Sequence, residues 1–131
     1  MLRVIHIVFS IMISISVSHA QDEIQWLTWE EMQVMQKREA RKVLIDVYTD
    51  WCGWCKRMDK AVFADPQWAE FAKKELSLAY IDFPQNKKLV PAKFVEQNAV
   101  LKTSFEIKGY PSYVVIKPDG KTILENWIKS I

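Results

Sequence analysis

Two cysteines three residues apart, placed directly after a strand-like run, constrain this chain more than any other feature. The run Val43-Leu44-Ile45-Asp46-Val47-Tyr48 precedes the segment Trp51-Cys52-Gly53-Trp54-Cys55-Lys56. A pair of this spacing that closes a strand and opens a helix is typical of thiol–disulfide exchange. At a helix start, unpaired N–H groups and the positive end of the helix dipole stabilise a Cys52 thiolate, which is the nucleophilic form. Cys55, one turn further on, lies on the same helix face and can attack a mixed disulfide formed at Cys52.

Two other interpretations of the cysteine pair deserve comparison. An exported chain with two cysteines could simply hold a structural disulfide. The loop between Cys52 and Cys55 is very short, and the entropic stabilisation from a disulfide grows with loop length, so we favour the redox interpretation. The reverse order of attack, with Cys55 first, is disfavoured because a residue one turn into a helix is usually more buried, and burial disfavours a thiolate.

Length and composition indicate one globular domain. The chain has 131 residues, of which 50% are hydrophobic, enough for a packed core without structural disulfides. The formal net charge is +2 and the basic residues are scattered among acidic ones. We therefore predict no nucleic-acid-binding surface.

Residues 1–20 have the pattern of a secretory signal peptide. Arg3 supplies a positive start, residues 4–17 are mostly apolar, and Ser18-His19-Ala20 places small residues where a signal peptidase cleaves. The alternative is an uncleaved membrane anchor, although the apolar stretch is shorter than the roughly 20 residues that a spanning helix needs. We expect a signal peptide at 1–20, a single domain at 21–131, and export across an inner membrane into the periplasm.

Both histidines of the chain, His6 and His19, lie inside this segment. A cleaved chain would contain none, which excludes Ser-His-Asp and Cys-His catalysis and histidine-ligated metal sites. A zinc site would need the two thiolates plus carboxylates, an unusual ligand set. The sequence therefore predicts no metal site and no bound cofactor.

Periodicity and turn signals divide the chain into alternating strands and helices. Thr28 to Glu31 forms a capping box that begins a helix, with Trp29, Met32, Met35 and Ala40 on its inner face. Asp65-Pro66 begins another helix, and Pro118-Asp119-Gly120 marks a hairpin. The expected helices are 29–42, 52–63, 66–76 and 93–105, and the expected strands are 24–27, 43–49, 78–82, 112–116 and 122–127.

This order, β-α-β-α-α-β-α-β-β, predicts an α/β fold with a mixed sheet and helices on both faces. Strand alternation in the run 43–49 places Asp46, Tyr48 and Asp50 on one face, and Ile45 and Val47 on the other. Large aromatic side chains are predicted to lie in the core and to carry no chemistry, namely Trp29, Trp68, Phe71, Phe94, Phe105 and Trp127.

Two segments resemble the thioredoxin superfamily, and the match covers nearly all of residues 21–131. Asp46 to Lys56 is similar to the family's strand-to-redox-helix segment, and Ile107-Lys108-Gly109-Tyr110-Pro111-Ser112 is similar to the segment with its cis-proline. Within the superfamily, Asp50-Trp51-Cys52 and Val62-Phe63-Ala64-Asp65-Pro66-Gln67 most resemble the C-terminal domain of the thiol:disulfide interchange protein DsbD and its small exported relatives. The resemblance implies a thioredoxin-like fold.

The chain departs from thioredoxin itself at several positions. Gly53-Trp54 replaces Gly-Pro between the cysteines, Lys60 replaces a kinking proline, and Leu78 replaces a lysine near the buried acid. The stretch 83–98 is longer than its counterpart. Little chain follows Trp127, so the final helix is expected to be short or absent.

The resemblance implies roles for the residues around the cysteines. Asp46 would lie beneath Cys55 and shuttle its proton, with a pKa raised by desolvation; the alternative is a solvent-facing acid. Pro111 would follow a cis peptide bond, and the backbone of Tyr110 would hydrogen-bond an extended substrate segment. Sequence alone predicts a trans bond and a turn proline.

The aromatic residues that bracket the pair have two possible roles. Trp51 and Trp54, with Gly53 between them, could dock an apolar partner surface. Alternatively, Trp51 packs on the domain and Trp54 only shields the disulfide.

The implied function is a thiol:disulfide oxidoreductase that exchanges electrons with cysteine pairs of other proteins. The DsbD-like segment favours a reductive role supplied by a membrane electron donor. Disulfide isomerisation and a non-enzymatic binding or chaperone role remain as alternatives.

Overall fold

Five strands form one mixed sheet at the centre of the molecule. The computed structural model describes residues 24–119 and 123–128. The strand order is β1-β3-β2-β4-β5. Strands β1 and β2 both pair with β3 in parallel, while β4 pairs antiparallel with β2 and with β5. The strands are β1 Trp26–Leu27, β2 Lys42–Tyr48, β3 Leu76–Asp82, β4 Ser112–Ile116 and β5 Ile123–Ile128.

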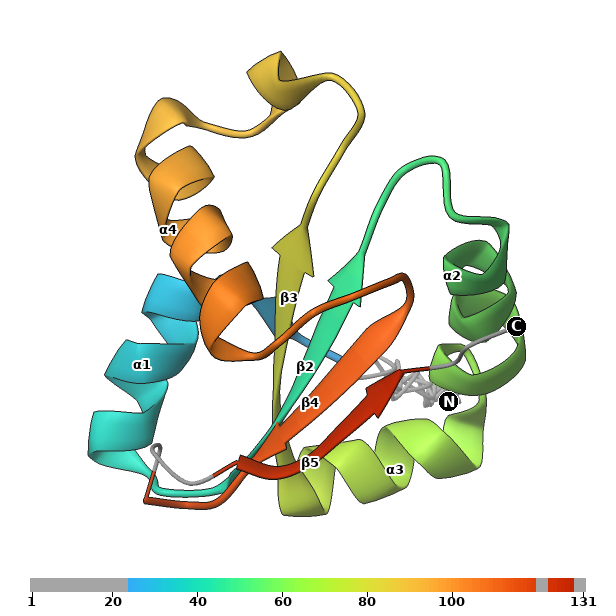
Figure 1. Ribbon diagram of the computed structural model, residues 1–131. Helices are drawn as coiled ribbons and strands as arrows, with labels where there is room; N and C mark the ends of the chain where they lie inside the picture. The colour runs from blue at the N-terminus through green and yellow to red at the C-terminus, as the bar shows by residue number, and fades with distance from the viewer. Residues whose placement is uncertain (1–23, 120–122, 129–131) are drawn as a thin grey trace, which may run out of the picture.

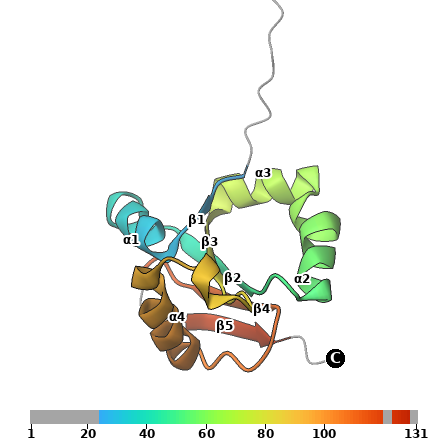
Figure 2. The ribbon, with the colours of Figure 1, turned by 90° about the horizontal axis from the view of Figure 1, so that it is seen from above.

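Helices cover both faces of this sheet, as the sequence predicts. Helices α1 and α4 lie on one side, and α2 and α3 lie on the other (Figures 1 and 2). A π-helical segment, Asp59–Phe63, continues α2, and a short 3-10 turn, Lys87–Leu89, precedes α4. The α-helices are α1 Trp29–Arg38, α2 Gly53–Met58, α3 Pro66–Glu75 and α4 Ala92–Ser104. The predicted element order and the thioredoxin-like fold are confirmed.

Local sequence fixes where α1 and α3 begin. The Thr28 side chain accepts a hydrogen bond from the Glu31 N–H at 3.3 Å, and the Glu31 carboxylate accepts one from the Thr28 N–H at 2.8 Å, completing the predicted capping box. The Asp65 carboxylate accepts from the N–H groups of Gln67 and Trp68 at 2.8 and 3.0 Å, and Pro66 follows in the first helical position.

The main hydrophobic core lies between the sheet and the helix pair α1 and α4. Ile45 and Val47 point into it from β2, as strand alternation predicts, and Trp29 and Met35 pack against it from α1. The buried members of this core are Leu27, Met32, Val43, Ile45, Val47, Ala79, Ile81, Leu101, Phe105, Ile107, Val114 and Ile116.

The predicted end of the first helix is wrong by one turn. Helix α1 stops at Arg38 and Ala40 is exposed, not part of an inner face. The Gln36 side chain causes the early stop: it donates to the Arg41 carbonyl at 2.6 Å and accepts from the Arg41 N–H at 2.8 Å. The chain then turns into β2, where strand pairing takes over from helix propensity.

One predicted core aromatic is also wrong. Phe71 is exposed, because α3 faces the sheet through Ala72, and successive helical side chains diverge by about 100°. Trp68 and Phe94 are half-buried, and Phe105 is buried. The side chain of Trp127, the hairpin residues 120–122 and the predicted signal peptide at 1–20 lie outside the description.

Helix α4 runs unbroken through Gln97-Asn98, and the buried Asn98 side chain donates to the Asp82 carbonyl at 3.1 Å. The expected short or absent final helix would follow Ile128 and so lies outside the described residues. None of the helices in residues 24–119 and 123–128 combines the length and the hydrophobicity needed to cross a bilayer.

Candidate active site

The two cysteines are joined as a disulfide at the N-terminal end of α2. Cys52 is the N-cap residue, with extended backbone, and its Cα lies 5.3 Å from that of Cys55. The Cys55 N–H points at the Cys52 Sγ at 3.1 Å. This N–H is one of the donors that a helix start leaves unpaired, and it would stabilise negative charge on that sulfur. The predicted Cys52 thiolate would receive this N–H.

Burial does not distinguish the two sulfurs in this oxidised form. The exposed fractions of Cys52 and Cys55 are 5% and 4%. The expectation that Cys55 is more buried therefore has no support in the disulfide state. What separates the two residues is position along the helix, since only Cys52 caps the helix and receives the N–H described above.

The tryptophans beside the disulfide are largely solvent-facing. Trp51 is 60% exposed, and the edge of its ring meets the ring of Tyr110 at a centroid distance of 6.0 Å. Trp54 is also exposed and stacks beneath the Arg57 guanidinium, 4.6 Å from the ring centroid. Apart from its chain neighbours, no residue lies within 4 Å of where a side chain on Gly53 would begin. This surface can accept a partner chain.

The loop before β4 reaches the same end of the sheet. Ser112 pairs with Val47, so Pro111 lies beside the last residue of β2, just before the redox loop. The Tyr110–Pro111 peptide bond is cis, as the resemblance implies. The Ser112 hydroxyl donates to the Gly109 carbonyl at 2.6 Å and closes the turn. Tyr110 and Trp51 are thus brought together from segments almost sixty residues apart in the sequence.

Asp46 is buried in the central strand, on the face opposite the main core. It lies between Tyr80 of β3 and Tyr113 of β4 in the strand register. Asp46 and Tyr48 line the same pocket, of about 320 Å³, as alternation predicts. Asp50 lies beyond the end of β2, and its carboxylate accepts a hydrogen bond from the Gln85 N–H at 3.1 Å.

Burial is the main cause of the raised pKa of Asp46. Together with the nearby charge of Asp59, it raises the pKa of Asp46 from an ordinary 3.8 to about 7. The Asp46 Oδ1 has no hydrogen-bond partner among the described residues, so nothing there offsets the lost hydration. Burial also raises the pKa of Tyr48 and of Tyr113 above the ordinary range. The alternative of a solvent-facing acid is therefore wrong. A carboxyl group with a pKa near 7 can both accept and release a proton at neutral pH.

Asp59 belongs to this pocket, although the sequence analysis did not single it out. It lies in the π-helical segment after α2 and lines the pocket together with Asp46 and Tyr80. Its position four residues after Cys55 was an available signal, because residues four apart share a helix face. Lys102 was missed as well; its ammonium donates to the Tyr110 hydroxyl at 3.2 Å.

The arrangement suits thiol–disulfide exchange. The described residues contain no group of three or more His, Cys, Asp or Glu side chains that could hold a metal ion. A disulfide at a helix start, an exposed aromatic surface beside it and a carboxyl group of near-neutral pKa can support nucleophilic attack, partner docking and proton transfer, respectively.

Comparisons with known proteins agree with the geometry. The sequence profile of the thioredoxin-like domain family matches residues 29–128. The disulfide bond reductase DsbH of Chlamydia pneumoniae is 29% identical over 105 residues, which cover 79% of this chain and 63% of that protein. This chain therefore corresponds to less than two thirds of the length of that relative.

Solved structures of DsbH and of a DsbD C-terminal domain are similar to this chain in fold. The structure of a DsbH oxidoreductase superimposes with a TM-score of 0.70 at 26% identity, over 80% of this chain and 72% of the other. The reduced C-terminal domain of DsbD from Neisseria meningitidis gives a TM-score of 0.60 at 25% identity, over 78% and 81% of the two chains. The predicted resemblance to the DsbD C-terminal domain is confirmed.

Proposed function

Because this chain belongs to the thioredoxin-like domain family, we propose that it is a thiol:disulfide oxidoreductase that acts on cysteine pairs of other proteins. The observation that carries the proposal is the Cys52–Cys55 disulfide at the N-terminal end of α2, beside the exposed ring of Trp51. A helix start activates the first sulfur, and the exposed ring provides a surface for the partner.

The proposed reductive cycle is a two-electron exchange. The Cys52 thiolate attacks one sulfur of the partner's disulfide; a new S–S bond forms and the partner's other sulfur leaves as a thiolate. The Cys55 thiol then loses its proton and attacks the Cys52 Sγ, which releases the second partner sulfur. The partner gains two electrons, and the Cys52–Cys55 pair is oxidised to the disulfide seen in the structure.

Asp46 is proposed to take the proton from Cys55 in the second step. Its pKa of about 7 allows it to accept a proton from a thiol and return it to solvent near neutral pH. The pocket that Asp46 shares with Asp59 and Tyr48 offers the route to solvent. The backbone of Tyr110, beside Pro111, is proposed to hydrogen-bond the partner segment, and Trp51, Gly53 and Trp54 to contact its side chains.

Single cysteine variants test the exchange itself. Cys55→Ser should accumulate a mixed disulfide through Cys52, because nothing resolves it, and should allow the partner to be captured and identified. Cys52→Ser should lose dithiothreitol-driven reduction of insulin disulfides while the fold is retained. If Cys52→Ser reduces insulin at the wild-type rate, exchange is not the function and a binding or chaperone role takes its place.

We also propose a direction for the exchange, in which this protein donates electrons to the disulfide of its partner. The relative DsbH of Chlamydia pneumoniae is a disulfide bond reductase by name, which supports this direction. Equilibration of the Cys52–Cys55 pair with glutathione tests it: a potential near roughly −270 mV fits a reductant, whereas one near roughly −120 mV fits an oxidant. Efficient recovery of scrambled ribonuclease without net reduction would instead favour isomerisation.

Export is proposed on the sequence of the first twenty residues. Residues 1–20 would be removed as a signal peptide, the domain at 21–131 would act in the periplasm, and a membrane electron donor would reduce it. N-terminal sequencing of the protein from a periplasmic extract should begin at Gln21. A protein that stays in the membrane fraction with residue 1 intact would support the anchor instead.

A further inference from the structure

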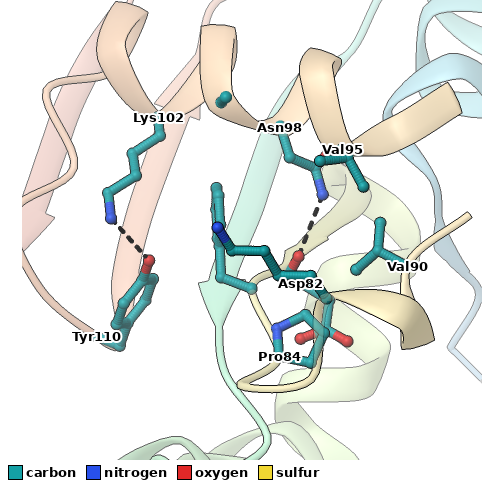
Figure 3. Close-up of a pocket in the computed structure, with 10 residues that line it drawn as sticks. Asp82, Pro84, Val90, Val95, Asn98, Lys102 and Tyr110 are labelled. Carbon is teal, nitrogen blue, oxygen red and sulfur yellow. Dashed lines mark hydrogen bonds between the residues drawn. The ribbon is translucent and has the colours of Figure 1, made fainter. Parts of the chain in front are cut away.

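A second pocket, of about 350 Å³, lies beside the disulfide surface and has no role in the exchange chemistry. It lies between α4 and the segment that follows β3, and Tyr110 closes one end (Figure 3). Most of its wall is apolar, including Phe83, Pro84, Val90 and Val95. The volume is at the lower end of the range for ligand pockets, so it suits one large side chain better than a folded surface.

Hydrogen bonds fix the wall of this pocket to Tyr48 and Asp50, which directly precede the cysteine pair. The Phe83 N–H donates to the Tyr48 carbonyl at 3.0 Å, and the Gln85 N–H donates to the Asp50 carboxylate at 3.1 Å. On the opposite side, Asn98 holds α4 to the end of β3 (Figure 3). The pocket is therefore built into the scaffold and keeps a fixed position relative to Cys52.

The pocket is continuous with the surface that we propose to bind the partner chain. The ring centroid of Tyr110 lies 5.7 Å from that of Phe83 inside the pocket and 6.0 Å from that of Trp51 beside Cys52. A polypeptide lying along Tyr110 with its cysteine at Cys52 would pass the mouth of this pocket. This continuity argues for an extended segment of the partner as the occupant.

The end of the pocket near Tyr110 carries a positive charge. The Lys102 ammonium donates to the Tyr110 hydroxyl at 3.2 Å and lies 5.4 Å from the ring centroids of Phe83 and Tyr110. Lys87 lines the pocket too, and neither lysine has a salt bridge among the described residues. Asp82 is the acid in the lining, but one of its carboxylate oxygens is enclosed and faces no solvent.

We propose that this pocket receives a large apolar side chain of the partner polypeptide, a few residues from its reactive cysteine, and that Lys102 attracts an acidic residue beside it. The inference rests on the proposed function and adds the class of sequence that the enzyme prefers. It follows from the apolar lining, the shared Tyr110 wall and the unpaired Lys102 charge at the mouth.

Short peptides with one cysteine as a glutathione mixed disulfide test this preference. One set places Leu at each position two to four residues from the cysteine, on either side, with Glu next to it. Matched sets replace Leu by Ala, or Glu by Lys. The second-order rate constant with reduced protein should favour Leu over Ala about tenfold in at least one register. Glu should be favoured over Lys about threefold at low salt, and less at high salt.

Matched variants locate the preference in the pocket. Val95→Trp should fill the pocket and reduce the Leu-to-Ala ratio to about one. Val100→Trp is the control, because Val100 is on the same helix and similarly exposed, 58% against 42%, but does not line the pocket. If Val95→Trp fails to fold by circular dichroism, Ala99→Leu fills the pocket from another lining position on the same helix.

A second pair of variants tests the role of the Lys102 charge. Lys102→Gln should abolish the preference for Glu over Lys, whereas Lys37→Gln, at an exposed site on α1, makes the same change in net charge and should keep it. Equal rates for Leu and Ala in every register, or a preference that survives filling of the pocket, would overturn the inference and leave the exchange function intact. If the reduced protein reacts with none of the peptides, both the proposed function and this inference are contradicted.

Discussion

Asp46 is a carboxyl group buried in the central strand of the sheet, and its effect on stability depends on pH. Its folded-state pKa of about 7 exceeds the ordinary 3.8, so between these values the folded chain holds a proton that the unfolded chain has released. The free energy of unfolding therefore falls as the pH rises from about 4 to about 7, and changes little from this source above that range. The buried charge is unfavourable at neutral pH, which is a sign of a functional rather than a structural role.

Replacement of Asp46 by Asn should remove this pH dependence. The difference between 3.8 and about 7 corresponds to at most about 4 kcal/mol, since each pKa unit is worth about 1.4 kcal/mol. We expect Asp46→Asn to be more stable than the wild type at pH 8, by about 2–4 kcal/mol, and to differ little at pH 4. Urea unfolding of both oxidised proteins at several pH values measures the effect.

Asp59→Asn is the control for this titration. Asp59 contributes to the raised pKa of Asp46 but is not its main cause. The variant should keep the decline in stability with pH and end it at a somewhat lower pH. A wild-type protein that is equally stable at pH 5 and pH 8, with Asp46→Asn no different, would show that Asp46 titrates normally.

Residue by residue, the sequence predicts well what a local motif determines. Cys52, Cys55 and the face of Asp46 follow from a six-residue motif and from strand alternation. Asp59 follows Cys55 by four residues and so had a local signal, whereas Lys102 reaches the site only because α4 approaches the loop at Tyr110. Pattern reasoning weighs each segment alone and does not place two segments against each other.

At the level of elements, helix starts were predictable and helix ends were less so. The starts of α1 and α3 depend on side chains within three residues, Thr28 with Glu31 and Asp65 with Pro66. The end of α1 depends instead on the bond pair between Gln36 and Arg41 and on the pairing of Lys42 with Leu76 in the sheet. Strand pairing at a distance thus decides a boundary that local propensity leaves open.

The cap of α3 gives an element-scale prediction. Asp65→Ala removes the acceptor for two backbone N–H groups and should lower the free energy of unfolding by about 1 kcal/mol. The redox site is on other elements, so insulin reduction should keep its wild-type rate. Thermal unfolding monitored by circular dichroism measures the loss.

Lys74→Ala is the matched control on the same helix. It removes the exposed salt bridge to Glu70, 2.7 Å long, and should cost under about 0.5 kcal/mol. If the two variants are equally stable, the Asp65 cap contributes no more than a surface ion pair and the explanation given for the start of α3 is wrong.

Across the whole molecule, the sheet separates two functions on its two faces. The face towards α1 and α4 carries the main apolar core, whereas the face towards α2 holds the pocket with Asp46, Asp59 and Tyr48. The apolar core on the first face stabilises the fold. On the second face, the buried Asp46 carboxylate lowers the free energy of unfolding at neutral pH. The central strand β2 contributes to both, because its side chains alternate.

This division predicts opposite effects at adjacent residues of β2. Ile45 is fully buried in the apolar core, so Ile45→Ala should create a cavity and lower the free energy of unfolding by about 2–5 kcal/mol. Asp46→Asn, one residue along, should raise it at pH 8. Val100→Ala, at an exposed position of α4, should change it by less than about 0.5 kcal/mol. Urea unfolding of the three variants at pH 8 decides the matter, and the same sign at Ile45 and Asp46 would mean that the two faces of β2 are not chemically separate.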